Sequence, residues 1–218
     1  MQENAKALHV RRAAVALSAA VALPLTLAAC SSDSKDNSPG SSASSAKASS
    51  PVEADGSMNT NEPFGPACSS VPKDGAGSFA GMAKDPVATA ASNNPALSTL
   101  VAAARKAGLV DTLNNAQNIT VFAPTNDAFA RIPQADLDKL LADKAALTKV
   151  LTYHVVGRKL TPKQLEKGSF ATLEKSELTT SGSGMTYTVN ESSNVVCGNV
   201  PTANATVHIV DTVLMPPR

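Results

Sequence analysis

The sequence has few aromatic residues and almost no net charge, and each shortage excludes a class of protein. Its 218 residues contain no Trp, and aromatic residues make up only 3% of the chain. A base-stacking surface or an aromatic platform for carbohydrate is therefore not expected, because both need exposed rings. The formal net charge is +1, so the chain lacks the basic stripe of a nucleic-acid-binding protein.

Catalytic and metal-binding motifs are also missing. Two of the three histidines, His154 and His208, lie outside the N-terminal region, and neither has a His, Cys or Glu neighbour at the spacing of a metal site. Ser-Gly-Ser-Gly at residues 181–184 lacks the Gly-x-Ser-x-Gly order of a nucleophile elbow and is typical of a hairpin turn. We therefore expect a protein that is not an enzyme and that uses no metal or cofactor.

The first thirty residues have the pattern of an export signal. Three Lys and Arg residues precede an uncharged, Ala-rich run over residues 13–29, which is typical of a secretory signal peptide. A transmembrane helix is the alternative, but this run is short for a span and is interrupted by Pro24. The sequence therefore predicts a signal peptide at residues 1–29 and an extracytoplasmic protein.

The signal ends in Leu27-Ala28-Ala29-Cys30, which resembles the lipobox of bacterial lipoproteins. In that family the cysteine thiol is diacylated and the signal is cleaved just before it, so Cys30 would hold the protein on the cell membrane. Several acyl chains anchor far better than one, because each buried methylene contributes about 0.8 kcal/mol. The alternative is a freely secreted protein with a leftover thiol, which would be a liability in an oxidising compartment.

Residues 30–63 have the composition of a flexible tether. Between positions 31 and 60 there are eleven Ser and no Leu, Ile or aromatic residue. Such a segment cannot bury enough apolar surface to offset its chain entropy. We expect a disordered tether with a reach of about 30 Å, which would lift a folded domain at residues 64–218 clear of the membrane.

Periodic patterns in the remainder indicate helices first and strands afterwards. Apolar residues recur at helical spacing over 97–104, and Gly108 is placed to end that helix. Thr125 or Asn126 is expected to cap a second helix, and Thr161 a third. After Gly168, β-branched runs separated by turn residues predict strands: FATL, LTTS, MTYTV, VVCG and ATVHIVDTVL. This order predicts one α+β domain.

The chain has an odd number of cysteines, three, which is explained if one cysteine carries lipid and the other two form a disulfide. With Cys30 assigned to the anchor, Cys68 and Cys197 remain, and export favours their oxidation. Closing a loop of about 130 residues would stabilise the fold by about 4–5 kcal/mol in the chain-entropy model. Two free thiols, or a dimer bridged between chains, are the alternatives.

Three stretches together resemble the fasciclin-like domain. TVFAPTNDAF at 120–129 resembles the first signature block of that family, and ATVHIVDTVLMP at 205–216 resembles its closing block. Tyr153-His154, followed by two valines, matches its central pair. With the lipobox and the cysteines, the chain also resembles the secreted and lipid-anchored fasciclin-type antigens of mycobacteria and related actinobacteria. The resemblance implies a wedge of two β-sheets with helices along one side.

The resemblance also implies an extracellular function, which in this family is often adhesion. Tyr153, His154, Val155 and Val156 correspond to a proposed adhesive motif, which makes them candidate contacts for a surface or matrix macromolecule; the alternative is a buried His154 that organises the adjacent strand. Asp211, expected within the last strand, should bond amides rather than a metal. Because some members bind small apolar ligands, the alternative to a surface lipoprotein for adhesion or protein interaction is an extracytoplasmic carrier of a lipid or pigment.

Overall fold

The computed structural model describes residues 62–217. The expected signal peptide at 1–29, the expected lipidation site Cys30 and nearly all of the expected tether lie outside the described residues, so they stay predictions. No helix within 62–217 combines the length and apolar character that a membrane span requires.

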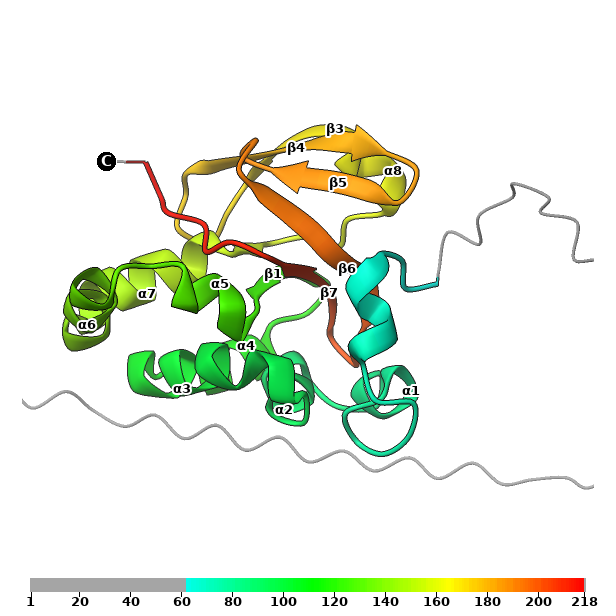
Figure 1. The fold of residues 1–218 in the computed structure, drawn as a ribbon, viewed down its shortest axis with the longest axis horizontal. Coiled ribbons are helices and arrows are strands. Elements are labelled where there is room, and N and C mark those ends of the chain that lie inside the picture. Colours follow the sequence, from blue (N-terminus) through cyan, green and yellow to red (C-terminus); the bar gives the residue numbers. More distant parts are fainter. Residues whose placement is uncertain (1–61, 218) are drawn as a thin grey trace, which may run out of the picture. The chain divides into compact units, whose positions relative to one another are not determined.

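Helices occupy the first half of the described chain, as the apolar spacing predicted. Figure 1 shows α1 to α7 on one side of the molecule, while α8 lies beside the strands on the other side. In chain order the helices are η1 (Pro66–Ser70), α1 (Phe79–Met82), α2 (Val87–Ser92), η2 (Pro95–Leu97), α3 (Ser98–Ala107), α4 (Val110–Asn115), α5 (Asn126–Ala130), α6 (Gln134–Ala142), α7 (Lys144–Tyr153) and α8 (Pro162–Leu165).

Local sequence signals set the ends of several helices. Gly108 ends α3 with a left-handed φ of 75°, a conformation that costs glycine little. The Thr125 side chain accepts a hydrogen bond from the Ala128 amide at 3.1 Å and so caps α5. Thr161 and Gln164 form the capping box that begins α8. These three predictions are confirmed.

Seven strands follow the order β2-β1-β7-β6-β5-β4-β3. The β1–β7 pair is parallel and the other pairs are antiparallel. The strands are β1 (Ile119–Pro124), β2 (Val155–Val156), β3 (Lys167–Ala171), β4 (Glu177–Ser183), β5 (Thr186–Val189), β6 (Ser193–Pro201) and β7 (Ala205–Val210). The predicted α+β class is confirmed.

The two expected sheets are two halves of this order, and β6 belongs to both. β6 pairs with β5 only through Ser193 and Asn194, whereas it stays paired with β7 as far as Pro201. Beyond Asn194 the two halves therefore separate. At the far ends of the order, a bridge between Val156 and Thr172 brings β2 against the chain after β3, so the sheet nearly closes on itself.

The two faces of β1 and β7 serve two different parts of the core. Alternate residues point to opposite faces of a strand. One face packs against α1, α2 and the following helices, and contributes Val121, Ala123, Val207 and Ile209. The other face lies between the halves of the sheet and contributes Phe122, Val210 and His208. Residues of both core regions are almost completely shielded from solvent.

Candidate functional site

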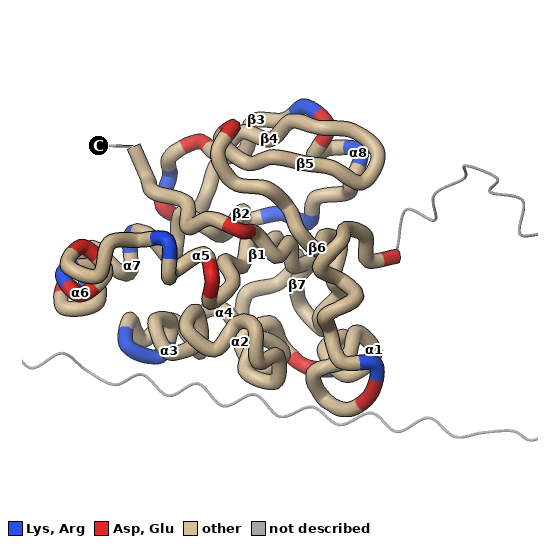
Figure 2. Tube along the Cα trace, in the orientation of Figure 1, with Lys and Arg blue, Asp and Glu red and all other residues tan. Residues whose placement is uncertain are grey.

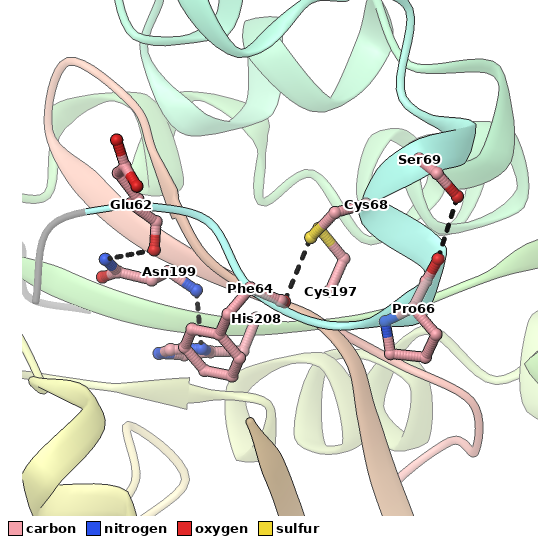
Figure 3. Close-up of a disulfide and its surroundings, with 8 residues drawn as sticks. All are labelled: Glu62, Phe64, Pro66, Cys68, Ser69, Cys197, Asn199 and His208. Atoms are coloured by element: carbon pink, nitrogen blue, oxygen red, sulfur yellow. Dashed lines mark hydrogen bonds between the residues drawn. A yellow bond between two sulfur atoms is a disulfide. The ribbon is translucent and has the colours of Figure 1, made fainter. Parts of the chain in front are cut away.

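A disulfide between Cys68 and Cys197 joins η1 to β6 (Figure 3). The two Cα atoms lie 4.9 Å apart although 129 positions separate the residues in sequence. Cys197 is fully buried. The predicted pairing within one chain is thereby confirmed, rather than free thiols or a bridge between chains.

The disulfide holds residues 62–70, here called the strap, across the gap where β5 leaves β6. Phe64 and Gly198 exchange two backbone hydrogen bonds, at 3.0 and 2.7 Å. The Phe64 ring lies directly on Gly198, where any Cβ would collide with it, and its centroid is 5.2 Å from that of Tyr187. The Cys68 sulfur lies 3.0 Å from the Phe64 carbonyl oxygen; an oxidised sulfur has no hydrogen, so this is a close contact. The strap thus fills the opening between the halves of the sheet.

The stretch predicted to make surface contacts lies in the interior. Tyr153, His154, Val155 and Val156 are each at most 2% exposed. The Tyr153 hydroxyl donates to the Glu177 backbone carbonyl at 2.9 Å and accepts from the Asn190 side-chain Nδ2 at 2.8 Å. The interpretation of these four residues as a contact surface is therefore corrected: they join α7 and β2 to the rest of the core. The sequence motif alone could not distinguish an exposed tyrosine from one that uses its hydroxyl inside the fold.

His154 uses both ring nitrogens to connect separate segments. Its Nε2 accepts a hydrogen bond from the Leu214 amide at 2.9 Å, so the ring proton is on Nδ1, which donates to the Val150 carbonyl at 2.8 Å. Burial lowers the pKa of His154 to about 4, although the bond to Val150 opposes the shift. The alternative reading, a buried histidine that organises the adjacent strand, is the one that the structure supports.

His208 is also a core residue. Its ring is stacked on Phe122 with centroids 5.4 Å apart, and its Nδ1 accepts a hydrogen bond from the Asn199 amide at 3.1 Å (Figure 3). Burial lowers the pKa of His208 to about 3. Across the part of the chain that the structure describes, no group of three or more His, Cys, Asp or Glu side chains is arranged to hold a metal ion.

Asp211 follows β7 rather than lying within it. Its carboxylate accepts hydrogen bonds from the Asn194 backbone amide at 2.8 Å and the Asn194 side chain at 3.0 Å, and Arg131 lies 3.4 Å away. Partial burial raises the pKa of Asp211, but the hydrogen bonds from Asn194 and Thr212 outweigh it, so the pKa falls below its usual value. The predicted bonding to amides is confirmed; the predicted position inside the strand is wrong, because β7 ends at Val210.

An apolar cavity of about 40 Å³ lies between the helices and the sheet. Its walls are almost wholly aliphatic, and Asn94 is one of the few polar residues that line them. Asn94 is 3% exposed, and its side-chain Nδ2 has no hydrogen-bond partner within residues 62–217. Sequence reasoning did not find this cavity, because α2, α3 and α4 form it together with strands far away in the sequence.

The fasciclin domain model matches residues 95–216, which is more than half of the chain. This protein belongs to the fasciclin family. The match begins at η2, so the strap, α1 and α2 precede it, and the disulfide joins them to it.

Several relatives of this fasciclin protein come from mycobacteria. It is 51% identical over 148 residues to the cell surface glycolipoproteins MPB83 of Mycobacterium bovis and MPT83 of Mycobacterium tuberculosis, a match that covers 66% of this chain and 66% of each relative. It is 48% identical to the immunogenic protein MPB70 of Mycobacterium bovis, over 66% of this chain and 75% of that protein. Among solved structures, a FAS1 domain pair from the insect cell adhesion molecule Fasciclin I matches 56% of this chain and 46% of that one, at 21% identity and a TM-score of 0.46.

Proposed function

We propose that this protein is a bacterial cell-surface lipoprotein that presents its fasciclin domain for adhesion to, or interaction with, another macromolecule. The observation that carries the proposal is the 51% identity to relatives named as cell surface glycolipoproteins. The Leu-Ala-Ala-Cys ending of the signal supplies a thiol, at Cys30, for the lipid anchor. The disulfide agrees with an extracytoplasmic location, because such bonds persist in oxidising compartments.

We place the contact surface on the outer face of β3, β4 and β5. Figure 1 shows these strands on the opposite side of the molecule from α1–α7. Their inward residues belong to the core, whereas their outward side chains are exposed or half-buried and mostly carry hydroxyl groups: Ser169, Thr179, Ser181, Ser183, Thr186 and Thr188. Short side chains on a paired sheet lose little rotamer entropy when a partner covers them. Figure 2 shows acidic and basic residues interspersed along the chain, so we expect adhesion to depend little on salt.

Two arginine substitutions test this surface. Ser169→Arg and Thr186→Arg each place a long charged side chain on the outer face, at exposed positions whose side chains make no hydrogen bond within 62–217. We expect both to reduce adhesion of cells that display the protein to host cells or matrix, with little change in thermal stability. Ala102→Arg, at an exposed position of α3, is the matched control and should adhere like the wild type. If Ala102→Arg abolishes adhesion and the two sheet variants do not, the proposed surface is wrong. If adhesion persists without the fasciclin domain, the proposed function is wrong.

The alternative function, a carrier for a lipid or pigment, has less support, because the apolar cavity of this structure is small. The apolar cavity between helices and sheet measures about 40 Å³, which holds little more than a water molecule or two. A lipid would therefore have to displace the helices over the cavity. Because those helices pack their apolar faces into the core, that displacement would expose apolar surface and cost free energy.

A further inference from the structure

A second cavity, of about 250 Å³, opens beside the end of β6 and the start of β7. The segment that leads into α8 forms one wall, and β6 and β7 form the other. Its lining includes Lys159, Leu160, Pro162, Asn199, Pro201 and Thr206. Unlike the apolar cavity under the helices, it is lined by both polar and apolar groups, and its volume suits a single sugar ring or a small acid.

The wall before α8 is held firmly in place. The Thr120 hydroxyl donates to the Arg158 carbonyl at 2.8 Å and accepts from the Leu160 amide at 2.9 Å. Gln164 in turn accepts a hydrogen bond from the Thr161 amide at 2.9 Å. The cavity is therefore preformed, which lowers the entropic cost of binding.

Thr206 provides an unused hydroxyl at this cavity. It is the Cα partner of Thr120 in the parallel β1–β7 pair, so both side chains lie on the same face of the sheet and toward the segment at 158–160. Thr206 is only 1% exposed, yet its Oγ1 has no hydrogen-bond partner among residues 62–217. A buried hydroxyl without a partner destabilises a fold, so a hydrogen bond from this hydroxyl to an oxygen of a water or a ligand would stabilise the protein.

Lys159 provides a positive charge at the same cavity. Its side chain is exposed and forms no ion pair with any acidic group of the described residues. Glu62 reaches this region through its backbone carbonyl, which accepts a hydrogen bond from the Asn199 side chain at 3.2 Å. Its carboxylate points away from Asn199 (Figure 3). A free ammonium group beside a buried donor is suited to an oxyanion.

We propose that this cavity binds a small molecule that carries an oxyanion, a carboxylate or a phosphate, on a body no larger than one sugar ring. The Lys159 ammonium pairs with the oxyanion, and the Thr206 hydroxyl forms a hydrogen bond to an oxygen of the ligand. The rings of Pro162 and Pro201 contact its apolar side. Asn199 is already engaged through its backbone and side chain, so it shapes the wall.

Isothermal titration of the purified full chain with glucuronate, glucose 6-phosphate and glucose tests this proposal. All three have a glucose-type ring: glucuronate carries a carboxylate, glucose 6-phosphate carries a phosphate, and glucose carries no anionic group. Comparing the first two therefore distinguishes a carboxylate from a phosphate ligand, and glucose is the uncharged control. We expect at least one of the two anions to bind at least about tenfold more tightly than glucose, the factor that one charge-assisted hydrogen bond supplies. Equal binding of all three, or no binding, would overturn the proposal.

Two variants and a control locate the site. Lys159→Ala and Thr206→Val should each raise the dissociation constant about tenfold or more. Thr206→Val has nearly the same shape and removes an unpaired hydroxyl, so its thermal midpoint should stay the same or rise. Lys163→Ala, in α8 but not lining the cavity, should bind like the wild type. If both Lys159→Ala and Thr206→Val bind the anion as the wild type does, the site is elsewhere. None of these results bears on adhesion through the outer face of β3–β5.

Discussion

At the scale of single residues, two buried histidines make stability depend on pH. Both rings accept a backbone hydrogen bond, at Nε2 of His154 and at Nδ1 of His208. A protonated imidazole cannot accept, and burial disfavours its charge. The pKa therefore falls to about 4 for His154 and about 3 for His208.

We expect stability to fall as the pH drops from about 6.5, the ordinary histidine pKa, toward 4. In this window the unfolded chain binds protons that the native protein does not, so acid favours unfolding, and the contribution is fully present only above 6.5. His154 alone should contribute on the order of 3 kcal/mol. Urea unfolding between pH 7.5 and 4.5 measures the slope. His154→Gln should be less stable at pH 7.5 and lose part of the slope, whereas an unchanged slope would contradict this account.

Tyr153→Phe separates a structural role from a contact role. The substitution removes the hydroxyl that bonds the Glu177 carbonyl and the Asn190 side chain, so we expect a loss of about 1–3 kcal/mol in the free energy of unfolding. Adhesion should stay unchanged, because Tyr153 is 2% exposed. A variant that keeps its stability but loses adhesion would restore Tyr153 as a contact residue.

At the scale of elements, the strap is held by both the disulfide and the packing of Phe64 on Gly198. We expect Gly198→Ala to destabilise the protein by about 1–3 kcal/mol, because the new methyl group overlaps the Phe64 ring. In a Phe64→Ala background the same substitution should cost much less, and the double-mutant cycle measures that coupling by chemical denaturation. Additive effects would mean that the ring does not press on Gly198.

The sequence predicted those elements whose signals are local. Gly108 and Thr161 mark helix boundaries through their own conformation and side chains, and both predictions were confirmed. The end of β7 was misplaced, because β-branched residues continue past Asp211 while Asn194 supplies its amide partners from another strand. The pairing of Phe64 with Gly198 was not predicted either, since no short-range pattern records a contact between residues so far apart.

The candidate sites show the same contrast between local sequence signals and contacts that depend on the tertiary fold. Counting cysteines predicted the pairing of Cys68 with Cys197 but left free thiols and a bridge between chains as alternatives, and the structure confirms the pairing. The burial of Tyr153 and the unpaired hydroxyl of Thr206 depend on which strands meet, and the motifs that contain them look the same for exposed and buried side chains. Residue type predicts which functional group a side chain carries, whereas tertiary packing decides whether that group faces solvent.

At the scale of the whole molecule, the proposed surface role depends on the predicted attachment of the protein to the membrane. No helix within 62–217 is suited to span a membrane, and Cys30 is the predicted point of attachment. A single acyl chain gives only marginal binding, while additional chains add about 0.8 kcal/mol per buried methylene. A diacylated Cys30 should therefore keep the protein with the cells.

Labelling with palmitate tests this attachment. We expect wild type to incorporate the label and to sediment with the membrane fraction, and Cys30→Ala to incorporate none and to appear in the culture medium. Cys68→Ala is the matched control, because it removes a cysteine that forms the disulfide and should leave the label in place. Equal labelling of wild type and Cys30→Ala would show that lipid is attached elsewhere. If Cys30→Ala lost its label but stayed with the cells, the protein would be held by contacts of its own, and adhesion by the domain would have to be measured on the released form.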